Sequence, residues 1–372
     1  MIAAELAATG LVFRGAEDVN HLRNAVFPSI AQLADGTLVS TMTVGREKNS
    51  ADVRCYATMS VDGGGTWSAP AKIFEPAAGR HPVSAGIRMS QARDGSLIGY
   101  VNLLDRSDPD APTTNRRTGG TVPREHAIIR SSDGRSWSDL GMFEFPLDWK
   151  CFGEPSPVIA VDESRWLLPS LTRLDWEGRC PLGLKSFALI SDDQGKTWPR
   201  SVDVFDMWSA KVITWEQKHV QLSDGRLMAV TWAFDSANKT DRPNHYTFSS
   251  DRGDSFATPP YESPLSGQTC TPLALEDNHI LCVYRRLDEP GLWAHLARIE
   301  GTNWIPLSHE CLWGRDRAAL PEVADSSIQN QHNLQFGYPQ LVQLLDGHIF
   351  AVFWAVEDGL SVIRWCRLQL SG

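Results

Sequence analysis

Two glutamates and a tyrosine occupy one recurring position in this chain. Glu154, Glu216 and Tyr338 each stand eight residues ahead of an aspartate that begins a short polar turn. A pair of carboxyl groups can cleave a glycosidic bond, one as general acid and the other as base or nucleophile. The shared spacing therefore predicts a carbohydrate site that contains these side chains. The alternative is that these polar groups only bind water in a channel.

The same position recurs in six units that fill the chain. Counting back from each turn aspartate picks Phe27, Gly86, Glu154, Glu216, Thr269 and Tyr338, at intervals of 53 to 69 residues. Each unit begins with a short apolar run that ends at a hairpin-like turn, usually Asp-Gly. The first unit reads as four strands, at residues 27–33, 37–44, 53–59 and 72–74. Because helical periodicity is nearly absent, this pattern predicts an all-β six-bladed β-propeller, as a single domain over residues 1–372.

A second motif, Ser-x-Asp-x-Gly-x-Thr-Trp, lies later in the units. It occurs at residues 191–198, with related copies at 60–67 and 249–256 and a copy one residue shorter at 131–137. The aspartate can accept hydrogen bonds from nearby backbone N–H groups, the glycine supplies a positive φ, and the aromatic residue fills a gap between sheets. We therefore interpret these aspartates as turn-stabilising residues.

The last unit lacks a fourth strand. Its strands are expected at Gln340–Leu344, Ile349–Trp354 and Val362–Leu368, after which the chain ends. The apolar run Gly10–Phe13 precedes the first unit. We predict that this run completes the last blade and closes the ring, because closure removes two exposed strand edges.

Counting strand directions predicts which end of the propeller carries the site. If the first strand of every unit lines the central channel, both kinds of turn lie at one end. The opposite, loop-bearing end collects the starts of the first strands and the long loops Leu104–Arg124, Arg173–Leu184 and Phe234–Asn244. Since function on rigid scaffolds concentrates in long loops, we expect the site at the loop-bearing end.

The Ser-x-Asp turns on a six-unit pattern resemble the sialidase (neuraminidase) superfamily of Asp-box, or BNR-repeat, propellers. The resemblance covers essentially the whole chain. It implies that Tyr338 corresponds to the family's nucleophile and Glu216 to the glutamate beside it. Such a pair avoids bringing an anionic nucleophile to an anionic sugar. It also implies Asp52 as the acid/base residue, two residues farther from the turn than the family pattern requires. The choice between this arrangement and a pair of carboxyl groups stays open.

The chain departs from that family at the arginines that hold the substrate carboxylate. Val26, Trp232 and Thr269 stand where the three arginines would be. A bidentate arginine–carboxylate contact is strong and geometrically demanding, and neither valine nor tryptophan can replace it. We therefore predict a terminal sugar other than ordinary sialic acid. The candidates for a rebuilt anion site are Arg23, Arg88, Arg285 and Arg286.

Other side chains near the loop-bearing end are candidates for sugar binding. Aromatic faces stack on sugar C–H faces, which singles out Trp149, Trp176 and Trp232. The histidines expected at that end are His81, His245 and His332. No His-x-His or His-Glu-x-x-His pattern suggests a metal, and no glycine-rich phosphate loop is present, so we expect no cofactor.

The bulk composition argues against several function classes. The formal net charge is −10 without a basic cluster, which argues against a nucleic-acid partner. No apolar run reaches the roughly 20 residues of a membrane span. The N-terminus lacks a basic region followed by an apolar core, and the seven cysteines lack metal-type spacing. Both features favour a cytoplasmic, reducing location, and secretion stays an alternative if a leader has been removed.

Together with the resemblance, these residues predict a sialidase-like exo-glycoside hydrolase that acts on a terminal sugar of an oligosaccharide or glycoconjugate. Two alternatives stay open. One is a non-catalytic carbohydrate-binding propeller, which the lost arginines favour. The other is a propeller lyase that cleaves a uronic-acid glycoside by β-elimination, with Tyr338 or a histidine as base.

Overall fold

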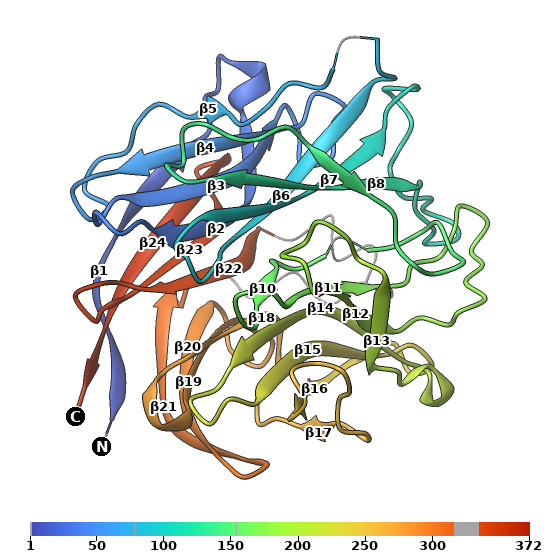
Figure 1. Cartoon of the computed structure of the whole chain (residues 1–372). Helices are drawn as coiled ribbons and strands as arrows, with labels where there is room; N and C mark the ends of the chain where they lie inside the picture. The colour runs from blue at the N-terminus through green and yellow to red at the C-terminus, as the bar shows by residue number, and fades with distance from the viewer. Residues whose placement is uncertain (1, 78, 154, 316–334) are drawn as a thin grey trace.

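Six four-stranded antiparallel sheets follow one another around a ring in the computed structural model of this chain (Figure 1). The structure describes residues 2–77, 79–153, 155–315 and 335–372. In sheet order, the first three blades contain β2 (Asn24–Gln32), β3 (Leu38–Gly45), β4 (Arg54–Ser60) and β5 (Ala71–Lys72); β6 (Val83–Gln91), β7 (Leu97–Asp105), β8 (Arg124–Ser131) and β9 (Gly141–Phe143); and β10 (Ile159–Ala160), β11 (Trp166–Leu171), β12 (Ser186–Ser191) and β13 (Arg200–Phe205). The other three contain β14 (Val212–Gln221), β15 (Leu227–Asp235), β16 (Thr240–Ser249) and β17 (Tyr261–Glu262); β18 (Gly267–Ala274), β19 (His279–Arg286), β20 (Leu292–Glu300) and β21 (Asn303–Trp313); and β22 (Phe336–Gln343), β23 (Ile349–Glu357), β24 (Leu360–Ser371) and β1 (Ala3–Arg14). The predicted all-β six-bladed β-propeller is confirmed.

Helical structure in the described residues is limited to short 3-10 turns. These are η1 (Asn20–Leu22), η2 (Trp208–Ala210) and η3 (Glu276–Asn278). Within the ranges that the structure describes, no helix is long and apolar enough to span a membrane.

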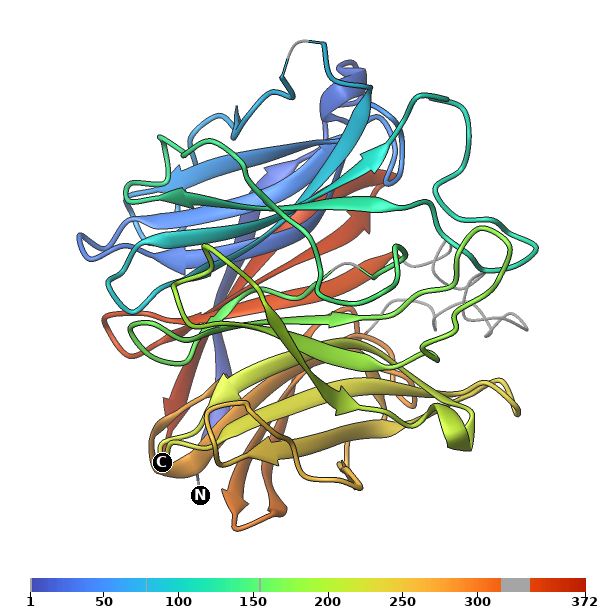
Figure 2. The ribbon, with the colours of Figure 1, turned by 45° about the vertical axis from the view of Figure 1, so that its right-hand side comes forward.

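The first strands of the blades line the centre of the ring. β2 contacts β6 on one side and β22 on the other, and β18 contacts both β14 and β22. The turned view in Figure 2 shows the sheets stacked around this centre, with the blue first blade beside the red last one. The starts of the first strands therefore gather around one opening.

The first and last strands close the ring. β1 pairs antiparallel with β24 from Ala3 opposite Ser371 to Arg14 opposite Val362, and the two chain ends lie side by side (Figure 1). This pairing confirms the predicted closure. Both strands extend beyond the predicted runs, and the last residues of β24, Gln369 to Ser371, pair with β1 and not with β23.

The repeated Ser-x-Asp turns are held by their own side chains. Asp62 accepts hydrogen bonds from the backbone N–H of Thr66 at 2.8 Å and from its hydroxyl at 2.7 Å, while the Ser60 hydroxyl accepts one from Gly64 N–H at 2.8 Å. These contacts, those of the Thr66 amide first, lower the pKa of Asp62 to about 2. The copies around Asp193 and Asp251 repeat the pattern. The aspartates stabilise the turns, as the sequence predicts.

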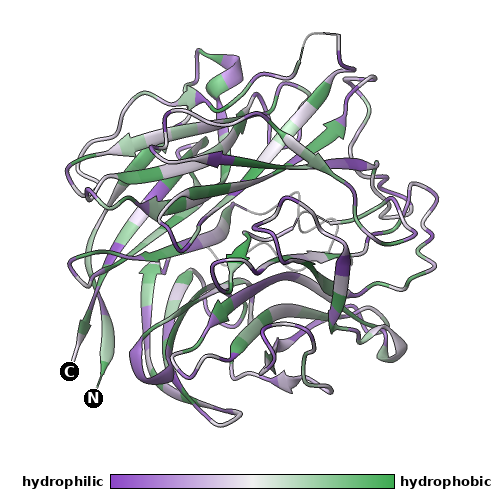
Figure 3. Ribbon diagram, in the orientation of Figure 1, coloured by the Kyte–Doolittle hydropathy of each residue, from purple (hydrophilic) through white to green (hydrophobic). Residues whose placement is uncertain are grey.

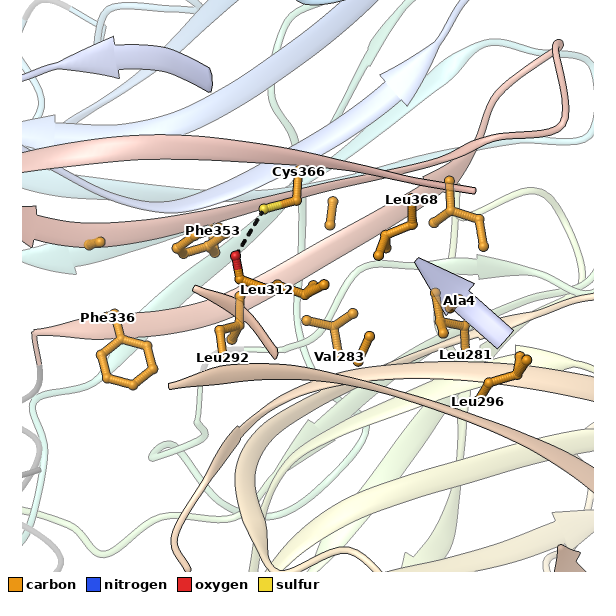
Figure 4. Packing of buried hydrophobic residues seen from close by; sticks show 14 of the residues in the cluster. Ala4, Leu281, Val283, Leu292, Leu296, Leu312, Phe336, Phe353, Cys366 and Leu368 are labelled. Carbon is orange, nitrogen blue, oxygen red and sulfur yellow. Dashed lines mark hydrogen bonds between the residues drawn. The ribbon is translucent and has the colours of Figure 1, made fainter. Parts of the chain in front are cut away.

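Hydrophobic clusters fill the spaces between neighbouring sheets. Residues from the fifth and sixth blades form one of them, which includes Leu281, Val283, Leu292, Leu312, Phe353 and Leu368 (Figure 4). Burial extends to Ala4 of β1, and the Cys366 thiol points at the Leu312 carbonyl at 3.9 Å. In Figure 3 the hydrophobic residues concentrate in the strands, and hydrophilic ones in many of the connections. Sheet-to-sheet packing of this kind fixes how the first strands are placed around the centre.

One connection differs from the sequence prediction. The prediction of a long irregular loop at Phe234–Asn244 is wrong, because β15 continues to Asp235 and β16 begins at Thr240. The Asp235 carboxylate accepts hydrogen bonds from the backbone N–H groups of Ala237 and Asn238, each at 3.0 Å. This turn allows Phe234 to pair with Asp241 in a tight hairpin.

Candidate functional site

Four residues at the repeated position share an unusual backbone conformation. The φ angles are 54° at Phe27, 52° at Glu216, 55° at Thr269 and 51° at Tyr338. In each of their strands the pairing register shifts at that point, which marks a β-bulge. Such positive φ values are uncommon outside glycine, and a bulge re-aims the side chain that it carries. The eight-residue count therefore identifies equivalent positions, although Gly86 lies in unbroken register.

A pocket opens where these four residues meet. Its wall contains Phe27, Gly86, Glu216, Thr269 and Tyr338 from the first strands. On the side of the second and third blades it is completed by the loop residues Thr113, Thr114 and Arg173 and by Arg124 at the start of β8. This central pocket therefore lies at the predicted loop-bearing end. It is lined by the aromatic side chains of Phe27, Trp215, Trp232, Tyr338 and Trp354.

Tyr338 is surrounded by cations. The Nε of Arg88 donates a hydrogen bond to its phenol oxygen at 2.7 Å, and the guanidinium carbon lies 4.4 Å from the ring centre. The ammonium of Lys218 lies 3.8 Å from the same ring centre. Phe27 packs edge-on against Tyr338, with ring centres 5.3 Å apart. Arg88, Lys218 and Tyr338 are all buried, so these interactions are little screened by water.

Arg285 contacts the backbone just before Tyr338 in the sequence. One Nη donates a hydrogen bond to the Phe336 carbonyl at 2.7 Å, and the other donates to the Gln268 side chain. Gln268 in turn donates to the Asp241 carboxylate at 3.0 Å. Burial lowers the pKa of Arg285 to about 10 and raises the pKa of Asp241. This buried chain of contacts holds Arg285 as a fixed positive charge behind the pocket.

Glu216 supplies a carboxylate to the pocket wall. The side chain is half-buried, and its Oε2 is enclosed without a hydrogen-bond partner among the described residues. Its charge acts on Arg285 and favours the charged guanidinium. A buried carboxylate oxygen without a partner is costly in a folded protein, and such groups concentrate at sites that bind ligands. Glu216 can thus accept a proton or a hydrogen bond from a bound molecule.

Two of the predicted arginines and one tryptophan line this pocket. Arg88 and Arg285 are almost fully buried, at 2% and 1% exposure. Trp232 packs against Trp215 with ring centres 4.7 Å apart, and its indole N–H donates to Asp241. The structure therefore brings Tyr338, Glu216, Arg88, Arg285 and Trp232 together in one cavity.

Other predicted residues lie elsewhere. Asp52 lies in a turn, where its carboxylate accepts the Arg46 N–H at 3.0 Å, and it lines a separate hollow with His21. Asp52, which the resemblance implies as the acid/base residue, therefore does not line the central pocket, because the two extra residues place it in the turn before β4 and not in a strand. Arg23 is exposed at the end of η1, outside the central pocket.

The remaining candidates support loops or fall outside the described residues. His81 is exposed and lies 3.4 Å from the Glu125 carboxylate. The indole N–H of Trp149 donates to the Arg173 carbonyl at 3.0 Å, and the Trp176 carbonyl accepts hydrogen bonds from the neighbouring loop. Neither tryptophan lines the central pocket. Glu154 and His332 lie outside the described residues, and their roles stay predictions.

Sequence reasoning missed four basic residues of this region. Lys48, Arg124 and Arg173 line the central pocket, and Lys218 lies under Tyr338. Only Lys218 carries a usable signal, since it follows Glu216 by two residues in the same first strand. Among the described residues, no group of three or more histidine, cysteine, aspartate or glutamate side chains is placed to hold a metal ion.

Solved structures with the same fold include a protein of unknown function and enzymes with different activities. A protein of unknown function from Dyadobacter fermentans shares 19% identity, with 99% of both chains covered and a TM-score of 0.74. The NanB sialidase from Streptococcus pneumoniae shares 13% identity over 97% of this chain and 70% of its own, with a TM-score of 0.65. An α-L-arabinanase from Penicillium chrysogenum, complexed with arabinobiose, shares 14% identity over 98% of both chains, with a TM-score of 0.63. At these identities the likeness shows the fold alone.

No curated protein matches the sequence of this chain. The family described as "BNR repeat-like domain" matches residues 36–351, which are most of the chain. The match agrees with the Ser-x-Asp turns and with the six four-stranded sheets. The chain therefore belongs to the family of BNR repeat-like domains, with the six-bladed propeller fold that sialidases also have.

Proposed function

We propose that the central pocket is the active site of a glycoside hydrolase that releases a terminal sugar from an oligosaccharide or glycoconjugate. One observation carries this proposal: Tyr338 and Glu216 enter the same pocket from two blades, both in the same bulge conformation. The fold supports it, since a sialidase and an arabinanase complexed with arabinobiose share it. The aromatic wall also suits a sugar ring.

Tyr338 is the proposed nucleophile and Glu216 its base. Arg88 donates to the phenol oxygen and cannot accept a hydrogen bond, so the phenol proton is directed elsewhere. As the phenol oxygen bonds to the anomeric carbon, Glu216 takes the phenol proton. The bond to the leaving oxygen breaks, and that oxygen is protonated by a general acid. Water then attacks the same carbon and gives one proton to the general acid's carboxylate, the bond to the phenol oxygen breaks, and Glu216 returns its proton to that oxygen, so the sugar is released and all three groups are restored.

Glu154 is the proposed general acid, on the basis of its repeat position alone. In the other arrangement, Glu154 and Glu216 act as the carboxyl pair and Tyr338 only contacts the sugar. Trapping separates the two schemes. A glycosyl fluoride with a second fluorine on the ring forms the covalent intermediate faster than water can hydrolyse it, and it should leave its sugar on Tyr338 in the first scheme, and on a glutamate or on no residue in the second. Peptide mass analysis of the treated protein reports which residue carries the sugar.

A panel of aryl glycosides and acidic oligosaccharides tests the activity itself. Glu216→Gln and Tyr338→Phe should each lower kcat by roughly 10²-fold or more, with nearly unchanged substrate binding. The matched controls are Glu262→Gln and Tyr261→Phe, because both residues are exposed on β17. Full turnover by both pocket variants would remove the proposed pair from the chemistry. Binding without turnover of any panel member would favour the non-catalytic propeller.

Simple α-sialosides should be poor substrates. Val26 is buried in the packing between the first and last blades, and Trp232 and Thr269 line the pocket without a positive charge. Release of free sialic acid at ordinary enzymatic rates would contradict this part of the proposal.

The buried guanidinium groups beside Tyr338 favour a lyase as the second candidate. A tyrosine base with arginines that neutralise a carboxylate suits β-elimination from a uronic-acid glycoside. Elimination leaves an unsaturated sugar that absorbs ultraviolet light, whereas hydrolysis leaves a saturated one. The absorbance of the products therefore decides between the two reactions.

A further inference from the structure

We propose that Asn102 binds a hydroxyl group of the sugar in the central pocket, and that Gly86 leaves the opening through which the Asn102 amide reaches that sugar. The inference rests on the proposed use of this pocket for a sugar. It adds a specificity-determining residue to the site and names the chemical group that this residue recognises.

The repeated position has no side chain in the second blade. Phe27, Glu216, Thr269 and Tyr338 fill it in their own blades, each in a bulge, whereas Gly86 lies in unbroken register. Gly86 lines the pocket together with these four residues. The second blade therefore leaves room at a place where four other blades present a side chain.

The second strands of the blades place a further row of residues behind the repeated position. In four blades the residue just before that position pairs with a second-strand residue that lines the pocket. These pairs are Val26 with Thr43, Trp215 with Trp232, Gln268 with Arg285, and Gly337 with Trp354. In the second blade, which has no bulge at this point, Asn102 of β7 pairs with Gly86 itself. Asn102 therefore stands behind the missing side chain.

The Asn102 amide occupies the space that Gly86 leaves. A Cβ built on Gly86 would lie 2.6 Å from Asn102 Oδ1, which is shorter than van der Waals contact. Asn102 is only 2% exposed, yet it lines the pocket. The glycine thus lets a second-strand side chain reach a cavity that first-strand side chains otherwise enclose.

The Asn102 amide lacks a hydrogen-bond partner for its nitrogen. Nδ2 is enclosed without a partner among the described residues. Tyr100, two residues earlier in β7, shows the usual arrangement, since its buried hydroxyl pairs with Nδ1 of His126 at 2.8 Å. Nearly all buried polar groups are paired, and an exception calls for an explanation. A ligand in the pocket that supplies the missing partner explains this one.

A sugar hydroxyl matches the amide better than other groups of a ligand do. An asparagine amide offers N–H donors and a carbonyl acceptor, and a hydroxyl both accepts and donates. A carboxylate or a sulfate only accepts, so its oxygens would lie against Oδ1 with no hydrogen between them. An apolar group would leave the amide unpaired, which is costly in a buried place. Asn102 therefore favours a sugar with a free hydroxyl directed at the second blade.

Three blades then hold the ligand from three sides. Asn102 comes from the second blade, Glu216 from the fourth and Tyr338 from the sixth. All three residues line one pocket. Because these are alternate blades of the ring, the three groups approach the ligand from different directions. A hydroxyl held by Asn102 would fix which carbon of the sugar faces Tyr338, and such orientation is a large part of catalysis.

Monodeoxy sugars test the proposal without turnover. The full chain is titrated by calorimetry with both anomers of the methyl glycosides of glucose, galactose and arabinose, and with their monodeoxy analogues. For a glycoside that binds, we expect one deoxy analogue to bind roughly tenfold more weakly than its parent, because the lost hydroxyl leaves the amide unpaired. This ratio of affinities is the hydroxyl preference.

Variants of Asn102 show whether its amide causes the hydroxyl preference. Asn102→Ala should bind the parent glycoside roughly tenfold more weakly and bind parent and deoxy analogue equally. Asn102→Leu, which keeps most of the volume, should behave in the same way. Asn303→Ala is the matched control and should keep the preference, since Asn303 is exposed on β21 and does not line the pocket.

Gly86→Ala tests the opening itself. The added Cβ should displace the amide and abolish the hydroxyl preference although Asn102 is intact. In the Asn102→Ala background the same change should have no further effect on the preference, because no amide remains to be displaced. Gly141→Ala is the matched control, since Gly141 is exposed on β9 and outside the pocket.

Three outcomes would overturn the hydroxyl site. The first is that no glycoside of the panel binds, and the second is that every deoxy analogue binds as tightly as its parent. The third is an unchanged hydroxyl preference in folded Asn102→Ala or Asn102→Leu, which would leave Asn102 a structural role alone. Failure of the proposed hydrolysis looks different. In that case the glycosides bind with the expected preference, but no glycosidic bond is broken.

Discussion

Arg88 donates a 2.7 Å hydrogen bond from Nε to the phenol oxygen of Tyr338. Its guanidinium also lies 4.4 Å from the Tyr338 ring centre and 4.6 Å from that of Phe27. These residues come from the first strands of the second, sixth and first blades. One buried cation therefore joins three blades at the candidate nucleophile. The orientation of Tyr338 depends on how the blades pack, and disturbance of that packing should reach the site.

Lys218 should matter for turnover and little for folding. Its ammonium lies 3.8 Å from the Tyr338 ring centre, where a desolvated cation–π contact is worth about 2 kcal/mol. Lys218→Met keeps most of the volume and removes a buried charge, so Tm should stay equal or rise. Once a substrate is known, kcat should fall by roughly tenfold.

Lys211→Met is the matched control for this variant. Lys211 lies 4.6 Å from the Trp208 ring centre, but it is exposed and outside the central pocket. Its kcat should equal that of the unaltered protein. Equal kcat values for both variants would remove Lys218 from the site.

Gly337→Ala should destabilise the protein more than alanine at another left-handed glycine. Gly337 has a φ of 144°, and an added Cβ would lie 2.8 Å from Nη1 of Arg285. Arg285 cannot easily move, since it is bonded to Phe336 and Gln268. The strain should cost about 1–3 kcal/mol of unfolding free energy, measured in urea.

Gly347→Ala separates the clash from the backbone preference. Gly347 has a φ of 86°, and nothing lies within 4 Å of an added Cβ there. The Gly347→Ala variant should therefore lose about 1–2 kcal/mol of unfolding free energy, which reflects the left-handed backbone conformation alone. If the two variants lose the same free energy, the contact with Arg285 contributes nothing.

Acid should weaken the Ser-x-Asp turns in a defined pH window. Hydrogen bonds from the Thr66 amide and hydroxyl lower the pKa of folded Asp62 to about 2, below the roughly 3.9 of an unfolded aspartate. The unfolded state then binds more protons, so this contribution is complete above pH about 4 and is lost as pH falls through about 2.

Asp62→Asn tests this linkage, because asparagine keeps an acceptor but does not titrate here. Urea midpoints measured between pH 7 and pH 2 should show a shallower decline for the variant than for the unaltered protein. Parallel declines would mean that folding does not lower the pKa of Asp62. Activity of the variant at neutral pH should be preserved, since Asp62 does not line the central pocket.

Removal of residues 1–14 should destabilise the propeller strongly. The deletion takes away β1, exposes the edge of β24, and uncovers the packing around Ala4 and Val12. We expect a large decrease in Tm. We also expect the truncated protein to aggregate, which light scattering would detect. Deletion of residues 1–2 alone, which precede β1, should leave Tm nearly unchanged.

The repeat and its turns could be read from the sequence because their causes are local. Ser60 and Thr66 both donate hydrogen bonds to Asp62 within one short segment. The conformation of the turn therefore depends only on residues of the motif itself. The eight-residue count worked for a related reason. A bulge at a fixed distance from the hairpin turn recurs at Phe27, Glu216, Thr269 and Tyr338, since register in a hairpin is set by the turn.

Sequence reasoning failed where a side chain's place depends on several blades or on a departure from regular strand geometry. The resemblance implies Asp52 as a site residue, but Asp52 lies in a turn and lines a different hollow. The Phe234–Asn244 segment has a loop-like composition and nonetheless pairs as a hairpin.

By itself, the sequence determined the six blades, the closing strand and the opening to which Glu216 and Tyr338 belong. Those features follow from hydrophobic periodicity and short-range hydrogen bonds. Only the tertiary structure decided that Arg88 lies under Tyr338, 250 residues away, and that Arg124 and Arg173 share one wall. The physical reason is that these neighbours meet through the angle and depth at which sheets pack, which are set by the summed contacts of many buried side chains and by no single motif.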